Sequence, residues 1–191
     1  SYLNILGNNN VSGISSINEG VITNSYFKGI IYATGNYVSG ISSISNNGLI
    51  ENVYNTGNIT TSGMYASGLV ARLINTTLQT SFNDGIIEAF SYASGLVAIN
   101  EGIIINSYNA QTIKANSYAS GISVINNGEI NQTYHYGQIL ANSYVAGLLI
   151  ENNGLITNSY YDKESVVHKE ESKALVNTAI YNTADNNLVK A

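Results

Sequence analysis

The stretch from Ser94 to Tyr108, SGLVAINEGIIINSY, contains the features that decide the fold. Two short runs rich in Leu, Val and Ile are separated by the turn sequence Asn100-Glu101-Gly102, and an aromatic residue closes the stretch at Tyr108. Short aliphatic and β-branched runs bounded by Asn and Gly are typical of β-strands joined by tight turns. We therefore expect an all-β structure built from short strands.

The same pattern recurs along the chain on both sides of this stretch. One aromatic set returns at spacings of 28, 28, 26, 26 and 26 residues: Tyr26, Tyr54, Phe82, Tyr108, Tyr134 and Tyr160. A second set stands three residues before a glycine: Tyr37, Tyr65, Tyr92, Tyr118 and Tyr144. Because two independent markers share one period, the chain is an array of internal repeats.

Three aliphatic positions recur within each repeat. Four residues before the first aromatic set lie Ile22, Ile50, Leu78, Ile104, Ile130 and Ile156. Five residues after it lie Ile31, Ile59, Ile87, Ile113 and Ile139, and after the Ser-Gly or Ala-Gly pairs lie Ile14, Ile41, Leu69, Leu96, Ile122 and Leu148. Three apolar columns separated by turns predict three short strands around a prism-shaped core.

These columns predict a parallel β-helix, a solenoid of about six coils of 26 to 28 residues. Coils stack at about 4.8 Å, so six coils make a rod of roughly 25 to 30 Å. Ordering one coil costs more conformational entropy than its few buried aliphatic side chains return, so stability must come from the stack. Parallel crossovers are almost always right-handed, and we expect that hand here.

The turns agree with a solenoid. Asn-x-Gly sequences such as Asn46-Asn47-Gly48 and Asn126-Asn127-Gly128 place Asn and Gly where a tight turn calls for positive φ. The third coil departs from this pattern, with Asn75-Thr76-Thr77 at the turn and Arg72 where the neighbouring coils have Ile44 and Ile99. We expect a bulge or a looped-out segment there.

The pattern changes after Tyr160. Residues 1–160 form the predicted repeat array, and nine of the nineteen charged residues fall between Asp162 and Lys190. A solenoid end exposes unpaired strand edges, which charged and less regular structure commonly covers. We therefore predict that residues 161–191 cap the C-terminal end, with a short helix around Lys173 to Tyr181. The N-terminal end has no comparable segment, so we expect further domains upstream, and downstream domains are compatible with the pattern.

Composition excludes several classes of function. Charged residues make up only 10% of the 191 residues, and the net charge is −5. Only Lys28, Arg72 and Lys114 are basic before position 160, which leaves no track for nucleic-acid phosphates. No apolar run reaches the length that crosses a bilayer, so we expect no membrane insertion. The chain has no cysteine, which leaves the compartment open.

The repeat resembles that of a known family. The sequence from Ser94 to Tyr108 resembles the GLUG-motif repeats of bacterial surface and secreted proteins, and the resemblance covers residues 11 to about 165. The ending Asn158-Ser159-Tyr160-Tyr161-Asp162 is similar to the terminus of such arrays. The family occurs in adhesins, haemagglutinin-like proteins and immunoglobulin A-specific metallopeptidases. This chain has Ala or Ser, as at Ala98 and Ser123, near the family's second Gly.

We find no arrangement of acidic residues that predicts catalysis. A glycan-cleaving β-helix needs carboxylates close together on one face. Glu19 and Glu101 occupy the same turn column but lie three coils apart, roughly 14 Å at the usual spacing. Asp84 and Glu88 bracket one strand and are interpreted as solubilising charges. We therefore predict no enzyme activity.

The histidines predict neither a metal site nor another cofactor. His135 and His168 lack any metal-binding spacing, and the three Asp residues are not grouped as calcium ligands. His135, between Tyr134 and Tyr136, is interpreted as a solvated turn residue. The abundant Ser and Thr side chains recur at repeat positions, and those at Ser25, Ser107 and Ser159, with Asn24, Asn106 and Asn158, predict hydrogen-bonded ladders along the stack.

The aromatic columns are the candidate binding feature. An outward row of tyrosines is a rigid platform for sugars or protein partners, whereas tyrosines stacked between coils also stabilise the rod without a ligand. The candidate face consists of Tyr26, Tyr54, Tyr108, Tyr134 and Tyr160. We predict a non-enzymatic adhesin-type stalk at the bacterial cell surface or outside the cell, which binds host glycan or extracellular protein laterally. The alternative is a non-catalytic repeat region of a large secreted peptidase, whose zinc domain lies outside this chain.

Overall fold

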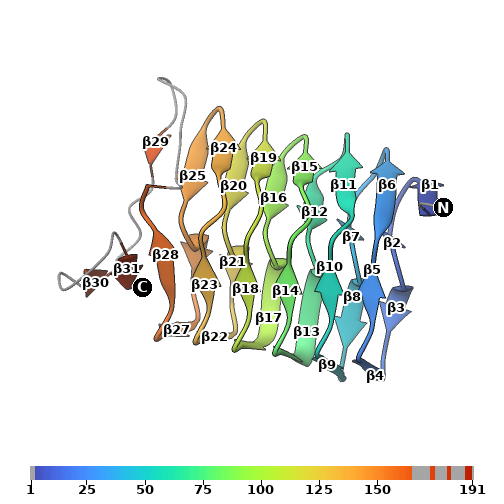
Figure 1. The fold of residues 1–191 in the computed structure, drawn as a ribbon, viewed down its shortest axis with the longest axis horizontal. Helices are drawn as coiled ribbons and strands as arrows, with labels where there is room; N and C mark the ends of the chain where they lie inside the picture. The colour runs from blue at the N-terminus through green and yellow to red at the C-terminus, as the bar shows by residue number, and fades with distance from the viewer. Residues whose placement is uncertain (1–2, 165–172, 175–179, 182–187, 191) are drawn as a thin grey trace.

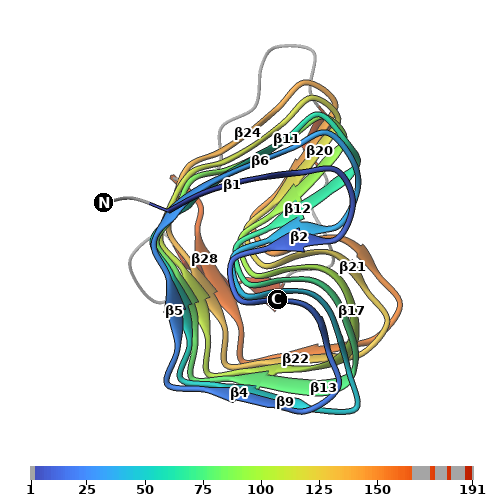
Figure 2. The same ribbon diagram turned by 90° about the vertical axis from the view of Figure 1, so that its right-hand side faces the viewer.

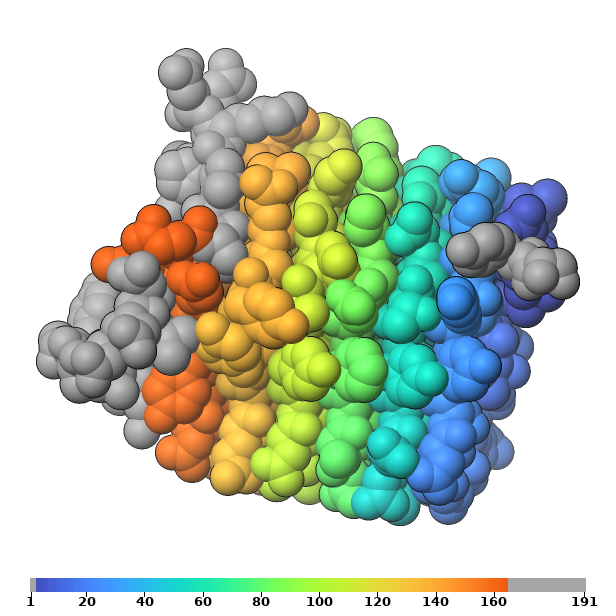
Figure 3. Space-filling model, in the orientation of Figure 1, coloured from blue at the N-terminus to red at the C-terminus, as the bar shows by residue number. Residues whose placement is uncertain are grey.

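The chain folds as a β-solenoid of about six coils, which confirms the predicted all-β class and parallel stacking. The computed structural model describes residues 3–164, 173–174, 180–181 and 188–190. Successive coils lie side by side along the axis, from β1 at one end to β28 at the other (Figure 1). The space-filling view shows the same coils as parallel bands (Figure 3). Among the described residues there is no helix of the length and apolarity that a membrane span requires.

Two parallel sheets form one half of each coil. Sheet A consists of β1 (Leu3–Gly7), β6 (Gly29–Ala33), β11 (Asn58–Thr61), β15 (Ile87–Ala89), β19 (Ile113–Ala115) and β24 (Ile139–Ala141). Sheet B consists of β2 (Val11–Ser12), β7 (Val38–Ser39), β12 (Tyr65–Ser67), β16 (Tyr92–Ser94), β20 (Tyr118–Ser120), β25 (Tyr144–Ala146) and β29 (Lys173–Ala174).

Two further sheets form the other half. Sheet C contains β3 (Ser15–Asn18), β8 (Ser42–Asn46), β13 (Val70–Gln79), β17 (Val97–Ile105), β21 (Ser123–Asn126) and β26 (Leu149–Asn152), together with β4 (Val21–Thr23), β9 (Leu49–Glu51), β22 (Glu129–Asn131) and β27 (Leu155–Thr157). Sheet D contains β5 (Tyr26–Phe27), β10 (Tyr54–Asn55), β14 (Phe82–Asn83), β18 (Tyr108–Asn109), β23 (Tyr134–His135), β28 (Tyr160–Asp162), β31 (Leu188–Lys190) and β30 (Ile180–Tyr181).

The coil has more sides than the three that the aliphatic columns predict. Viewed down the axis, sheets A and B enclose one lobe, and sheets C and D enclose the other (Figure 2). The three-strand prediction is wrong because it counted only positions with Ile or Leu. The aromatic positions of sheet D and the Tyr-Ala-Ser positions of sheet B form strands of their own.

The three predicted aliphatic columns do line the core. Their members are buried in every coil except at the two ends, where Ile14 is 42% exposed and Ile156 is half-buried. The column that contains Ile41 and Leu69 lies in the sharp turn between sheets B and C rather than on a strand. The core is therefore continuous along the axis, and each coil covers the apolar side chains of the next.

Positive φ occurs mainly in a different column from the predicted Asn-x-Gly turns, among which Asn47 does have it, at 56°. Among the described residues no glycine has positive φ, whereas Asn24, Asn52, Thr80, Asn106, Gln132 and Asn158 all have φ between 48° and 52°. These six residues occupy one corner, where sheet C meets sheet D. Asn tolerates this left-handed conformation better than other residues with a Cβ. The glycines of the Asn-x-Gly turns instead allow adjacent coils to approach closely. A Cβ on Gly128, for example, would meet the backbone oxygen of Gly102.

The third coil contains the predicted bulge. Pairing between β13 and β17 shifts register between Ile74 and Thr77, with Asn75 at φ 44°. Thr76 replaces the missing Asn-x-Gly contacts, because its Oγ1 accepts a bond from the Gly48 N–H at 3.2 Å. Arg72 stands beside Ile44 and Ile99 in register, and its guanidinium donates two hydrogen bonds to Glu101, at 3.0 and 3.1 Å.

The predicted helix around Lys173 to Tyr181 is wrong where the structure describes that range. Lys173–Ala174 is strand β29, which pairs in parallel with β25, and Ile180–Tyr181 is strand β30, which pairs antiparallel with β31. Residues 175–179 lie outside the described residues. β31 also pairs antiparallel with β28, the last strand of the parallel stack in sheet D. Whether residues 161–191 cap the solenoid stays a prediction.

Replacing Gly95 with Ala is expected to destabilise the fold by about 3 kcal/mol, since overpacking a dense site costs about this much. The new Cβ would meet the Gly121 carbonyl oxygen and lie 2.5 Å from Cγ of Asn109. Urea denaturation measures the difference. Gly20→Ala is the matched control, because nothing lies within 4 Å of a Cβ at that position. Equal stability of the two variants would contradict the inference that close approach between coils requires glycine at position 95.

Replacing Thr80 with Asn is expected to stabilise the protein by about 1 kcal/mol, because a β-branched residue is strained at its φ of 51°. Asn52 and Asn106 occupy the same position in the adjacent coils with nearly the same φ. The reverse exchange, Asn106→Thr, serves as the control and should destabilise by a similar amount. Thermal unfolding of both variants would refute the prediction if Thr80→Asn lowered the midpoint.

Candidate functional site

The candidate tyrosine face predicted from the sequence points outward on sheet D. Tyr26 and Tyr108 are exposed, and Tyr54, Tyr134 and Tyr160 are half-buried. All six aromatic residues of this set pair in one register from β5 to β28. Partial burial raises the pKa of the Tyr108 and Tyr134 phenols above 10.0, so both are neutral at physiological pH.

The rings of this face stack on one another. From Tyr26 through Tyr54 and Phe82 to Tyr108, the ring centroids are 4.9 to 5.1 Å apart and the planes lie within 5° of parallel. The regular part ends there, because Tyr136 stacks at wider angles on both Tyr108 and Tyr134. A ring covered on both faces offers a ligand only its edge and hydroxyl, whereas aromatic recognition of sugars uses the ring face. This geometry favours a stabilising role, and ligand binding by these tyrosines stays a prediction.

The second aromatic set forms another ladder at the start of the sheet B strands. Tyr37, Tyr65, Tyr92, Tyr118 and Tyr144 stack with centroids 4.8 to 5.3 Å apart. All five are half-buried, and their ring faces are also occupied by their neighbours. Stacked aromatic residues therefore reinforce two outer edges of the solenoid, along the whole second set and from Tyr26 to Tyr134 in the first.

Behind the first ladder lies a buried polar column that sequence reasoning missed. Asn55 donates to Asn83 at 2.7 Å, Asn83 donates to Asn109 at 2.6 Å, and the Asn109 amide contacts Nδ1 of His135 at 2.9 Å. All four side chains are fully buried. Each position directly follows an outward aromatic residue, so the two-residue alternation of a strand was the available signal.

His135 is buried, so the prediction of a solvated turn residue is wrong. Its strand places Tyr134 outward and His135 inward, in the column of asparagines. The Asn109 amide nitrogen lies 2.9 Å from Nδ1 of His135, and Nε2 has no hydrogen-bond partner. Burial lowers the pKa of His135 from 6.5 to about 4. His168 lies outside the described residues.

The predicted ladders of Ser and Asn are partly confirmed. The Ser107 hydroxyl accepts from the Ser81 N–H of the preceding coil, and the Ser159 hydroxyl accepts from that of Thr133. Ser25 instead donates within its own coil to Thr23. The Asn52 side chain donates to that of Asn24, and Asn158 to that of Asn131, each one coil away.

The acidic residues do not converge. Glu101 is engaged by Arg72 at 3.0 Å, and Glu19 is exposed three coils away in the same column. Glu88 lies on β15 and is in register with Thr60 of β11 and Lys114 of β19. Asp84 precedes β15. In the part of the chain that the structure describes, no three His, Cys, Asp or Glu side chains gather in a way that could hold a metal ion.

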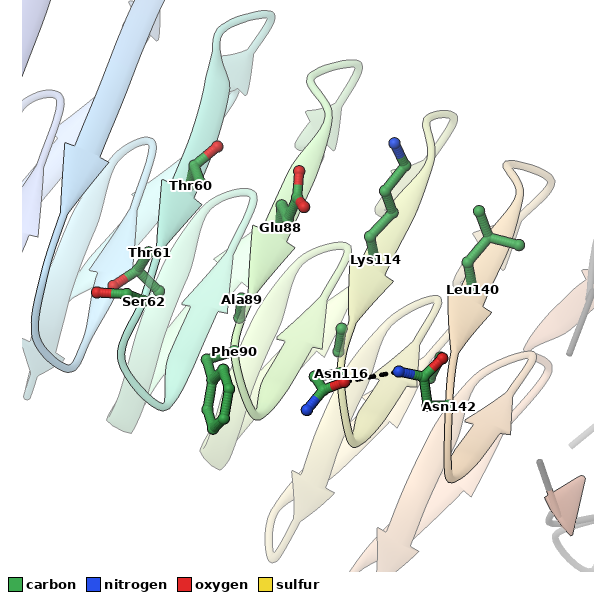
Figure 4. Close-up of a pocket in the computed structure, with 12 residues that line it drawn as sticks. Thr60, Thr61, Ser62, Glu88, Ala89, Phe90, Lys114, Asn116, Leu140 and Asn142 are labelled. Carbon is green, nitrogen blue, oxygen red and sulfur yellow. Dashed lines mark hydrogen bonds between the residues drawn. The ribbon is translucent and has the colours of Figure 1, made fainter. Parts of the chain in front are cut away.

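The outer face of sheet A carries a groove of about 560 Å³ that runs along the axis (Figure 4). Two rows of outward side chains border it. One row, in register from β11 to β24, is Thr60, Glu88, Lys114 and Leu140, and the second row, just beyond the strand ends, is Ser62, Phe90, Asn116 and Asn142. Between the two rows lie Thr61, Ala89, Ala115 and Ala141, whose side chains point inward because successive residues of a strand alternate between its two faces.

The second row is held by the stack itself. The Asn116 N–H donates to the Phe90 carbonyl oxygen, and the Asn142 N–H donates to that of Asn116, both coil to coil. The Asn142 amide also donates to the Asn116 side chain at 2.6 Å (Figure 4). The main-chain groups along this border are therefore used in coil-to-coil bonding, and the side chains face the groove.

Phe90 is the aromatic residue of this groove and is 58% exposed. Its row neighbours are Ser62 and Asn116, so no ring covers its faces from the adjacent coils. Sequence reasoning missed it because it searched for recurring aromatic residues, and Phe90 occurs once in its column. Aligning the coils would have identified it as the exception.

The fold and the groove define the protein as a β-solenoid with a lateral surface groove. No family model, curated protein or solved structure matches the chain. The similarity to GLUG-motif repeats therefore stays a prediction from the sequence.

Acid is expected to destabilise the folded protein through His135. Since the folded-state pKa is about 4 and the unfolded value is 6.5, the unfolded chain binds the proton first, and stability falls as pH drops from 6.5 toward 4. Asn occupies this column in three coils, so His135→Asn should keep the fold and remove this loss. Between pH 7 and pH 4.5 we expect the wild type to lose roughly 2 to 3 kcal/mol more than the variant. Urea denaturation at both pH values provides the measurement, and equal losses would show that His135 does not control acid stability.

Proposed function

We propose that this chain is a rigid, non-enzymatic binding module of adhesin type, which presents a lateral groove to a glycan or protein partner. The observation that carries the proposal is the groove on sheet A, where an unstacked Phe90 stands among hydroxyl, amide and charged side chains. Ligand sites are usually concave, with apolar and aromatic lining and a few convergent polar groups.

Rigidity supports the same proposal. Every groove-lining residue belongs to a coil that is hydrogen-bonded to its neighbours, and two aromatic ladders brace the outer edges. A binding surface on such a frame loses little conformational entropy when a ligand binds. A module of this kind holds its ligand at a fixed place on a stalk.

The setting of the module rests on the sequence resemblance. GLUG-motif arrays occur in secreted and surface proteins of bacteria, which favours an extracellular or cell-surface location and further domains in the same polypeptide. The repeat region of a large secreted peptidase is an alternative setting with the same module.

Screening the purified chain against arrays of glycans and extracellular proteins tests the proposal. We expect the wild type to bind, Phe90→Ala to bind weakly, and Tyr108→Ala/Tyr134→Ala to bind like the wild type, with the folding of each variant checked by circular dichroism. Loss of binding only in the tyrosine variant would move the site to the aromatic ladder of sheet D. Absence of any ligand would contradict the binding proposal and leave a spacer.

A further inference from the structure

We infer that the groove on sheet A binds a linear, neutral oligosaccharide that lies along the solenoid axis, one sugar residue to each coil. This inference rests on the proposed function and specifies the ligand class of the same groove. Four outward pairs of side chains border the groove: Thr60 with Ser62, Glu88 with Phe90, Lys114 with Asn116, and Leu140 with Asn142.

The spacing of these pairs favours a sugar chain. Adjacent coils lie about 4.8 Å apart, whereas an extended peptide advances about 3.3 Å per residue, and its side chains on one face repeat at twice that distance. A peptide along the axis would fall out of register after one coil. A pyranose residue in an extended chain advances by nearly the coil spacing, so each sugar meets one pair of side chains.

The hydrogen-bonding groups lead to the same class of ligand. Of the four strands beneath the groove, β11, β15 and β19 are paired on both sides and have no free edge to which a peptide strand could add, and β24 is the last described strand of sheet A. What faces the groove is a set of side chains: hydroxyls at Thr60 and Ser62, a carboxylate at Glu88, and amides at Asn116 and Asn142. Hydroxyl-rich ligands use such donors and acceptors, and the exposed face of Phe90 can pack against the C–H face of a sugar ring.

Charge selects a neutral chain. Glu88 and Lys114 are register partners on adjacent strands, and no ion pair joins them among the residues that the structure describes. Their charges cancel over the groove, and the whole chain carries a net charge of −5. A polyanionic glycan would therefore be repelled by the protein as a whole and would find a single cation in the groove.

A length series of neutral β-linked glucose oligosaccharides, from two to six residues, tests this inference by isothermal titration calorimetry on the full chain. Affinity should rise with each residue up to four and then level off, because four pairs border the groove. Phe90→Ala should weaken binding by about tenfold, which corresponds to the loss of a ring contact of about 1.4 kcal/mol. Phe90→Tyr should retain binding, and Tyr108→Ala, on sheet D, should bind like the wild type.

The outcomes separate this inference from the proposed function. Binding of a peptide or protein that depends on Phe90, without binding of neutral oligosaccharides, would overturn the ligand class and leave the proposed function standing. Preference for a sulfated or uronic-acid oligosaccharide of equal length would overturn the neutral assignment. Oligosaccharide binding that Phe90→Ala leaves unchanged would overturn the site. If oligosaccharides, peptides and proteins all fail to bind, both proposals fall.

Discussion

The structure depends on one constraint: each residue stacks on the equivalent residues of the coils above and below, about 4.8 Å away. A position in the coil must therefore hold a side chain that tolerates its own kind on both sides. Aliphatic, aromatic and amide side chains meet this condition, whereas like charges repel. The columns of Ile, Tyr and Asn and the charged content of only 10% are consequences of this constraint. Where charges do stack, as at Glu88 and Lys114, they are of opposite sign.

The same constraint explains where the regular columns change. His135 takes the place of a buried asparagine and keeps the contact with Asn109, but it leaves Nε2 without a partner. Leu73 replaces the turn asparagine in the third coil, and the bulge at Asn75 brings Thr76 to supply its hydrogen bonds. Such exceptions are tolerated because the neighbouring coils stay paired and hold the backbone in register, even where they also lack the asparagine, as at Tyr161 beside His135 and Ser45 beside Leu73.

The groove arises from the outward face of the same stack. Inward alanines at Ala89 and Ala141 alternate with outward Glu88 and Phe90 or Leu140 and Asn142, so the two outward rows stand on either side of an empty strip. Because the coils repeat, this strip continues along the axis instead of closing into a pocket. In the proposed function, ligand binding falls to the positions at which the coils differ, since the identical positions maintain the stack.

The sequence by itself determined the period, the aliphatic columns, the parallel stacking and the bulge near Arg72, because these follow from local alternation and from the recurrence of residue types. It did not determine the four sheets of the coil, the buried state of His135, the strands at Lys173 and Ile180, or the groove around Phe90. Those features depend on how the chain turns between sheets and on which outward side chains the stack aligns. Such long-range packing is decided only in the tertiary structure, because a single repeat contains no partner for it.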